Sequence, residues 1–220
     1  MPDKPEDDVQ WLTDDPSDVH WTLILAHGAG QGSDSPFMER MGRTLGRAGM
    51  RVIRFDFPYM IDMRQTGRRK PPDREPMLRE SWKRTIDQVL SGGTDQRRLL
   101  IGGKSMGGRI ATLIADEQDV AGLVCLGYPF HPPGKPYRLR VAHLKQLRTP
   151  TLICQGSRDP FGNRDEVSGY PLSEAIRLTW IEDGEHGFKP RKQSGRTLEQ
   201  NLRQAAEAII GFAKSQSKWS

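Results

Sequence analysis

The chain has 220 residues, which suits one domain large enough to bury a core around a central sheet. Its net charge of +5 comes from dispersed Lys and Arg, and the one dense basic run, residues 68–70, lacks interleaved aromatics. This pattern favours solvated surface charge over a nucleic-acid site. We find neither a bilayer-length apolar run nor the apolar core of a signal peptide at the acidic N-terminus. We therefore expect a cytoplasmic protein without a membrane partner.

Residues 1–20 are rich in Asp and Pro and predict a loose arm or a short edge strand. Between residues 21 and 214, short apolar runs alternate with amphipathic stretches, which is typical of a parallel α/β sheet covered on both faces. Residues 215–220 are expected as a C-terminal tail. The expected strands are 21–26, 50–55, 98–102, 122–127, 151–155 and 177–181. Cys125 and Cys154 lie in two of these runs, and we expect buried free thiols in a reducing compartment.

Apolar residues that recur every three or four positions predict helices around 37–48, 78–90, 110–114 and 202–210. The segments 58–76 and 129–150 are expected as long loops. Both follow strands, so both fall on the edge where open α/β sheets bind ligands. We predict that these two loops form the walls of a pocket.

The segment 103–107 reads Gly-Lys-Ser-Met-Gly, a G-x-S-x-G motif between a predicted strand and a predicted helix. Such a turn exposes a serine hydroxyl for nucleophilic attack, here that of Ser105. One alternative is an ordinary glycine-rich turn with an incidental serine. A phosphate-binding loop is excluded, because its pattern needs glycine at the position of Arg98.

A serine nucleophile needs a histidine to take its proton and an acid to orient that histidine. Asp159 and His186 follow Ser105 in chain order, each just after a predicted strand. Taken singly, Asp159 before proline is also a turn signal, and a histidine in a polar loop is usually a solvated one. Glu182, Asp183 and Glu185 are rival acids, but they crowd the histidine in sequence. The joint order predicts a catalytic triad of Ser105, Asp159 and His186.

The turn at residues 27–33 follows the first confident strand and opens with a His-Gly-Ala-Gly sequence. Acyl transfer needs two N–H donors for the developing oxyanion. We predict the amide of Met106 as one donor and that of Ala29 as the other, with Gly30 as the second choice. The histidine of this turn is interpreted as a hydrogen-bonding support. A dinucleotide fingerprint would need glycine at position 33, which holds serine.

Substrate contacts are expected from residues around these groups: Gly28, Gly30, Lys104, Tyr128, Phe130 and His131, beside Phe57, Tyr59 and Phe188. For Lys104 two interpretations stay open, attraction of a carboxylate- or phosphate-bearing substrate and a surface ion pair. No metal or cofactor is expected, and the expected partner is a small acyl substrate. The oligomeric state is open.

Segments 27–31, 103–109, 127–135, 155–159 and 184–188 carry a resemblance that extends over residues 21–213. The chain resembles a compact α/β-hydrolase without an inserted lid, similar to dienelactone-hydrolase-like proteins and to a small α/β-hydrolase-like family. The resemblance implies a three-layer α/β fold with about six to seven mostly parallel strands, the first antiparallel pair being missing or reduced to one short strand. It also implies hydrolysis of a carboxylic ester, thioester or lactone. Some eukaryotic members are subunits of chromatin-modifying complexes, so the alternative function is an interaction module.

Overall fold

The computed structural model describes residues 11–16 and 19–216 and contains a seven-stranded sheet of order β1-β3-β2-β4-β5-β6-β7. The strands are β1 (Trp11–Asp14), β2 (Trp21–Ala26), β3 (Met50–Phe55), β4 (Leu99–Lys104), β5 (Gly122–Leu126), β6 (Thr151–Gly156) and β7 (Ile176–Ile181). β1 pairs antiparallel with β3, and the other neighbours pair in parallel. The predicted mostly parallel sheet is confirmed, and β1 is the short N-terminal edge strand. The N-terminal part of the expected arm, residues 1–10, lies outside the described residues.

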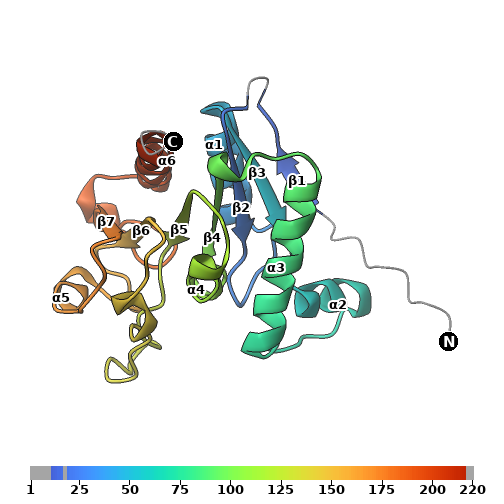
Figure 1. Ribbon diagram of the computed structural model, residues 1–220. Coiled ribbons are helices and arrows are strands. Elements are labelled where there is room, and N and C mark those ends of the chain that lie inside the picture. Colours follow the sequence, from blue (N-terminus) through green and yellow to red (C-terminus); the bar gives the residue numbers. More distant parts are fainter. Residues whose placement is uncertain (1–10, 17–18, 217–220) are drawn as a thin grey trace.

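Helices cover both faces of this sheet, as Figure 1 shows. They are α1 (Pro36–Arg47), α2 (Pro58–Thr66), α3 (Glu75–Ser91), α4 (Met106–Thr112), α5 (Arg164–Val167) and α6 (Leu198–Gln216). Short 3₁₀ helices span Gln96–Arg98, Ala115–Glu117, His143–Lys145 and Lys192–Ser194. α2, α3 and α4 pack on one face of the sheet, and α1 and α6 pack on the other. α6 runs two residues into the stretch 215–220 that was expected as a tail.

The protein has two hydrophobic cores, one on each face of the sheet, and successive side chains along the buried strands pack alternately into them. In β2, Leu23 and Leu25 pack toward α1 and α6, whereas Ile24 packs toward α3. Each is fully buried, which contributes roughly 1.5–3 kcal/mol per side chain. Cys125 and Cys154 fall in opposite cores, so their thiols lie on opposite faces of the sheet and stay free, as predicted. Burial raises the pKa of the Cys154 thiol to about 12.

The segment 58–76 differs from its predicted loop, because its first half is helix α2. Pro58 starts this helix, where its missing N–H costs nothing, and Gly67 ends it with φ 67°. Two successive residues, Tyr59 and Met60, are buried, so the segment lacks the three-to-four spacing that signals a helix. The segment 129–150 contains the 3₁₀ turn His143–Lys145 and is otherwise irregular.

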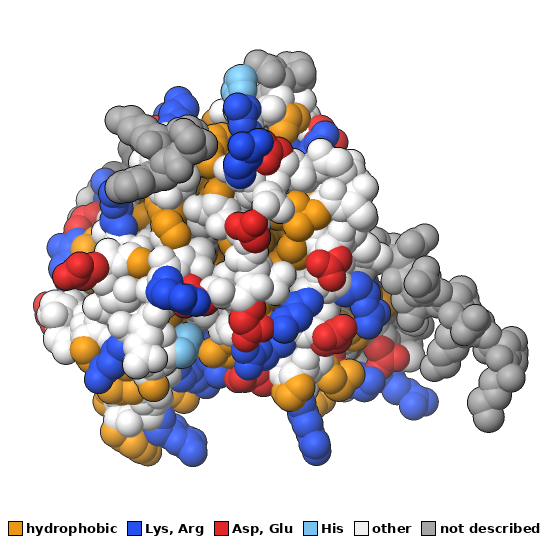
Figure 2. All heavy atoms as spheres, in the orientation of Figure 1, with side chains coloured by type: hydrophobic (Ala, Val, Ile, Leu, Met, Phe, Trp, Pro, Cys, Tyr) orange, Lys and Arg blue, Asp and Glu red, His pale blue; other side chains and the backbone are white. Residues whose placement is uncertain are grey.

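The surface in Figure 2 carries acidic and basic side chains interspersed with apolar ones, which form small groups along the lower edge of the view. Within residues 11–16 and 19–216, none of the helices has both the length and the apolar character that crossing a bilayer requires.

Candidate active site

Ser105 lies at a sharp turn between β4 and α4, in a backbone conformation with φ 52° and ψ −113°. A non-glycine residue there is strained by roughly 1–3 kcal/mol, which the surrounding packing must enforce. The Ser105 amide donates to the Leu126 carbonyl over 3.0 Å. Gly107 lets α4 approach β2 closely, because a Cβ there would lie 2.6 Å from the Ala26 carbonyl oxygen. The turn thus holds the serine hydroxyl out at the carboxyl edge of the sheet.

Three polar side chains from three different loops form a continuous relay at this edge. His186 Nε2 lies 2.9 Å from Ser105 Oγ, and His186 Nδ1 lies 2.8 Å from Asp159 Oδ2. A carboxylate only accepts hydrogen bonds, so the proton of a neutral imidazole belongs on Nδ1. That leaves Nε2 as an acceptor for the serine O–H. The structure therefore brings together the three residues that the sequence order singled out.

The Asp159 carboxylate is fully buried and held by donors other than the histidine. Its Oδ1 accepts from the Phe161 amide at 2.8 Å, and its Oδ2 accepts from Gln155 Nε2 at 3.1 Å. Gln155 is itself fixed, because its Oε1 accepts from the Tyr128 amide at 2.7 Å. The sequence analysis missed Gln155, although a polar residue closing the apolar run of β6 was a usable signal.

The ring of Phe161 is a second feature that the sequence analysis missed. It stacks on the His186 imidazole with ring centroids 4.1 Å apart and an interplanar angle of 28°. The stack covers one face of the imidazole and restricts its tilt toward Ser105. Its position two residues after Asp159 was the only sequence signal for this contact.

The other candidate acids, Glu182, Asp183 and Glu185, bind partners outside the relay. Asp183 Oδ1 accepts from Arg191 Nε at 2.8 Å and lies 2.9 Å from Arg158 Nε. The hydrogen bond from Arg191 lowers the pKa of Asp183 to about 2. Glu182 pairs with an arginine of α5, and Glu185 accepts from two backbone amides of its own loop. The geometry selects Asp159 as the acid next to the imidazole.

The turn after β2 is braced by two buried side chains. His27 Nε2 accepts from the Phe57 amide at 3.1 Å, so Nδ1 carries the proton and donates to the Gly28 carbonyl at 2.6 Å. Burial lowers the pKa of His27 and keeps the ring neutral. The Tyr59 hydroxyl lies 3.3 Å from the Gly28 oxygen and 3.1 Å from the Ala29 oxygen. These contacts match the support expected of the histidine and add Tyr59 to it.

This bracing orients the peptide that the sequence analysis chose as an oxyanion donor. The Gly28 carbonyl and the Ala29 N–H belong to one trans peptide group, so they point in opposite directions. Donors from His27 and Tyr59 that fix the oxygen therefore also fix the direction of the N–H. A Cβ built on Gly28 would lie 3.6 Å from Ser105 Cβ, so this turn lies against the nucleophile.

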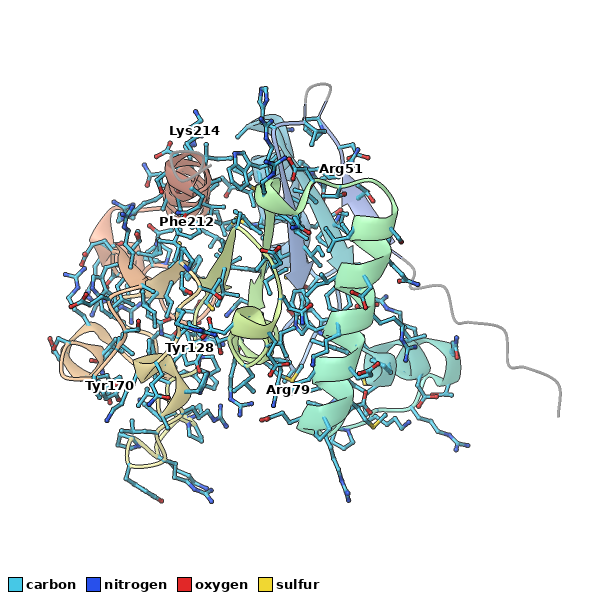
Figure 3. All side chains as sticks on the ribbon, in the orientation of Figure 1. Arg51, Arg79, Tyr128, Tyr170, Phe212 and Lys214 are labelled. Carbon is cyan, nitrogen blue, oxygen red and sulfur yellow. The ribbon has the colours of Figure 1, made fainter. Side chains whose placement is uncertain are left out.

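Three residues expected to contact substrate lie inside the protein instead. Tyr128 and Phe130 have no exposed surface, and His131 is 2% exposed. The Tyr128 hydroxyl donates to the Arg140 carbonyl at 2.9 Å, in the interior beside α4 (Figure 3). These side chains support the wall of the site and present no surface to a ligand. The expectation was wrong because an aromatic loop residue can as easily fill a core as line a pocket.

The structure gives Lys104 a contact that the sequence analysis did not foresee. Its ammonium donates to the backbone carbonyl of His186 at 2.7 Å rather than to a surface carboxylate. Phe57, Tyr59 and Phe188 are also buried, whereas Gly28, Gly30 and Lys104 stay at least partly accessible.

A hollow of about 400 Å³ opens beside the turn after β2. Gly30 and Gln31 of the turn form one wall, and Met60 and Met63 of α2 form another. Arg64 at the rim is neutralised by Asp34 and Asp56. A larger hollow of about 610 Å³ lies at the amino end of β2, a full strand length from Ser105. The smaller hollow shares the turn after β2 with Gly28, which lies against Ser105, but Ser105 and His186 do not line it.

Comparisons with known proteins agree with this architecture. The family model described as an alpha/beta hydrolase domain matches residues 19–214. An alpha-beta serine hydrolase homologue from Coxiella burnetii superposes with a TM-score of 0.71 at 19% identity, covering 90% of each chain. A dienelactone hydrolase from Anabaena variabilis gives a TM-score of 0.67 at 21% identity, covering 94% of this chain and 93% of its own. A serine hydrolase without a lid from Xanthomonas campestris gives 0.65 at 18% identity, over 90% and 88%. At these identities the likeness shows the fold.

Proposed function

This chain belongs to the alpha/beta hydrolase family, and from that premise we propose that it is a serine hydrolase acting on a carboxylic ester, thioester or lactone. The observation that carries the proposal is the unbroken relay of Asp159, His186 and Ser105, with contacts of 2.8 and 2.9 Å. The relay begins at a strained nucleophile turn and ends on a buried carboxylate. A serine hydroxyl without such a base is a poor nucleophile.

The proposed reaction has two acyl-transfer steps. Ser105 Oγ attacks the substrate carbonyl while His186 Nε2 takes its proton, and Asp159 stabilises the resulting imidazolium. The Ala29 and Met106 amides donate to the oxygen that becomes negative. The imidazolium then protonates the leaving group, which departs and leaves an acyl group on Ser105. Water attacks this ester with His186 as general base, releasing the acid and restoring the serine.

The proposed substrate size is taken from the hollow that shares the turn after β2 with the candidate oxyanion donor Ala29. Its volume of about 400 Å³ is near the low end for ligand pockets, and its apolar wall comes from Met60 and Met63. Flexible thioethers adapt to varied apolar groups. We propose compact acyl groups, with no fixed charge recognised by Arg64 because its two carboxylates already neutralise it. Short p-nitrophenyl esters should turn over faster than long-chain ones, and a clear long-chain preference contradicts this part of the proposal.

The test of the function is covalent labelling of the purified full chain. A fluorophosphonate probe should label Ser105, as mass spectrometry of the modified peptide would show. Ser105→Ala should abolish the labelling and lower ester turnover by about 10⁴-fold or more. Ser157→Ala, which removes a serine that donates nothing to the relay, is the matched control. A correctly folded wild type that neither labels nor hydrolyses esters or thioesters would instead support the interaction-module alternative.

A further inference from the structure

Lys104 joins the strand that carries the nucleophile to the loop that carries the base. It is the last residue of β4, directly before Ser105, and its Nζ donates to the His186 carbonyl at 2.7 Å. The two residues are 82 positions apart in the chain. This hydrogen bond therefore connects the backbone around His186 to β4 in addition to the side-chain relay.

The fold leaves a slot for this ammonium. Gly127 has φ 67°, and a Cβ there would lie 2.9 Å from Lys104 Nζ and 3.0 Å from the His186 carbonyl oxygen. On the other side, the Phe37 ring of α1 lies 5.4 Å from Nζ, in the range of a cation–π contact. Only a residue without a side chain at position 127 lets the ammonium and the carbonyl meet.

The charges that face this slot are acidic. Asp159, on the loop after β6, and Glu185, on the loop after β7, both interact favourably with the Lys104 cation. Helix α1 contributes the uncharged Phe37, and the carbonyl that accepts from Lys104 belongs to the titratable His186. A fully buried carboxylate such as Asp159 is costly without a compensating cation. Lys104 supplies that cation.

We propose that Lys104 is a positioning residue, which holds the His186 backbone against β4 and compensates the buried charge of Asp159. The inference rests on the proposed function. It assigns Lys104 no contact with substrate, because the ammonium is directed at the backbone carbonyl of His186. Burial lowers the pKa of Lys104 to about 8, so the ammonium predominates at neutral pH and is lost in the alkaline range.

Removing the ammonium should lower kcat and leave KM nearly unchanged. Without the anchor the loop can shift, and a misplacement of about 1 Å at a catalytic group costs about 10²-fold in rate. Lys104→Met should therefore lower kcat by about 10- to 100-fold, with KM within about twofold. Lys189→Met, an exposed lysine on the same loop, is the matched control and should keep the wild-type kcat. Wild-type kcat in Lys104→Met overturns the proposal.

Chemical rescue separates positioning from general damage to the fold. Lys104→Ala leaves room for a small amine, so ethylammonium or propylammonium should restore part of the lost kcat. Tetramethylammonium has the charge but no N–H to donate, and it should restore none. Equal rescue by all three cations, or by none in a folded variant, contradicts the proposed hydrogen bond.

Two further measurements keep the inference testable in every case. The wild-type kcat should decline above about pH 8, and this decline should vanish in Lys104→Met. The NMR resonance of the His186 Nδ1 proton needs no substrate and should shift in Lys104→Met relative to Lys189→Met. A shift in a protein that neither labels nor hydrolyses would sink the proposed function and retain the positioning role. If the wild type is active but the resonance is the same in Lys104→Met and Lys189→Met, the proposed function stands and the positioning role is overturned.

Discussion

The Asp159 carboxylate accepts hydrogen bonds from His186, Gln155 and the Phe161 amide. All three bonds require the carboxylate oxygens to act as acceptors. Asp159→Asn keeps the size but replaces one oxygen by an NH₂ donor. The amide can then favour the wrong imidazole tautomer, with the proton on Nε2. We expect kcat for an ester substrate to fall by about 10³- to 10⁴-fold, measured by steady-state kinetics.

The matched control for this substitution is Asp116→Asn. Asp116 also accepts several hydrogen bonds, from the Arg148 and Thr149 amides and the Thr149 hydroxyl, but it lies outside the relay. Its variant should lose some stability and keep its kcat. If Asp159→Asn retained more than about a tenth of the wild-type kcat, the assigned role of the carboxylate would be wrong.

Tyr59 offers a separate test of the oxyanion turn. Tyr59→Phe removes the hydroxyl that contacts the Gly28 and Ala29 carbonyl oxygens while keeping the buried ring. Loss of a hydrogen bond worth about 0.5–1.5 kcal/mol should lower kcat by about 3- to 10-fold. Tyr128→Phe is the control, because its equally buried hydroxyl bonds to Arg140 away from the turn. Equal kcat values for the two variants would remove Tyr59 from the support of the turn.

At the residue scale, the relay was predictable and its surroundings were not. Ser105, Asp159 and His186 each follow a strand at the same sheet edge, and their placement after predicted strands in this chain order predicts their proximity. The contacts of Gln155 and Phe161 depend on the conformation of the loops that follow β5 and β6, so their sequence positions gave only weak signals. The burial of Tyr128 likewise depends on the path of the segment 129–150.

Glycines in the helices differ in whether the surrounding structure leaves room for a Cβ. Gly107→Ala places a Cβ 2.6 Å from two backbone oxygens, those of Ala26 and His27. Helix α4 must then move away from β2, which we expect to lower stability by about 1–3 kcal/mol and to lower kcat. Gly211 in α6 has open space, so Gly211→Ala should raise stability by about 0.5–1 kcal/mol. Urea unfolding and ester turnover measure both effects, and destabilisation by the two variants alike would refute the packing argument.

Some strands and helices follow from local sequence patterns, whereas others depend on tertiary contacts. The strands β2 and β3 match their predicted bounds, because short, mostly apolar runs without clean alternation signal strands buried on both faces. Helix α2 was missed because Tyr59 and Met60 are buried side by side, and the proline-rich stretch after it indicates a loop. Tertiary contacts with α3 and the turn after β2 stabilise this helix more than its own periodicity.

For the whole molecule, charge balance controls the response to acid. The chain has 33 basic and 28 acidic residues, and several of the acidic ones pair with arginines in different parts of the surface. Protonation of the carboxylates breaks these pairs and leaves a larger net positive charge, which repels itself in the compact state. Stability should therefore fall on acidification, most steeply where the strongly perturbed carboxylates titrate.

The loss of stability on acidification can be measured at one carboxylate, that of Asp183. Its folded pKa of about 2 lies below its ordinary value of 3.8, because Arg191 donates to the ionised form. The folded state thus binds fewer protons than the unfolded state, and the contribution to stability is complete above about pH 4 and is lost as the pH falls toward 2. Asp183→Asn should be less stable than the wild type at pH 7, and the difference should shrink between pH 4 and pH 2. Urea unfolding of both proteins across this range measures it, and a difference that stayed constant with pH would show that Asp183 acts by shape and not by charge.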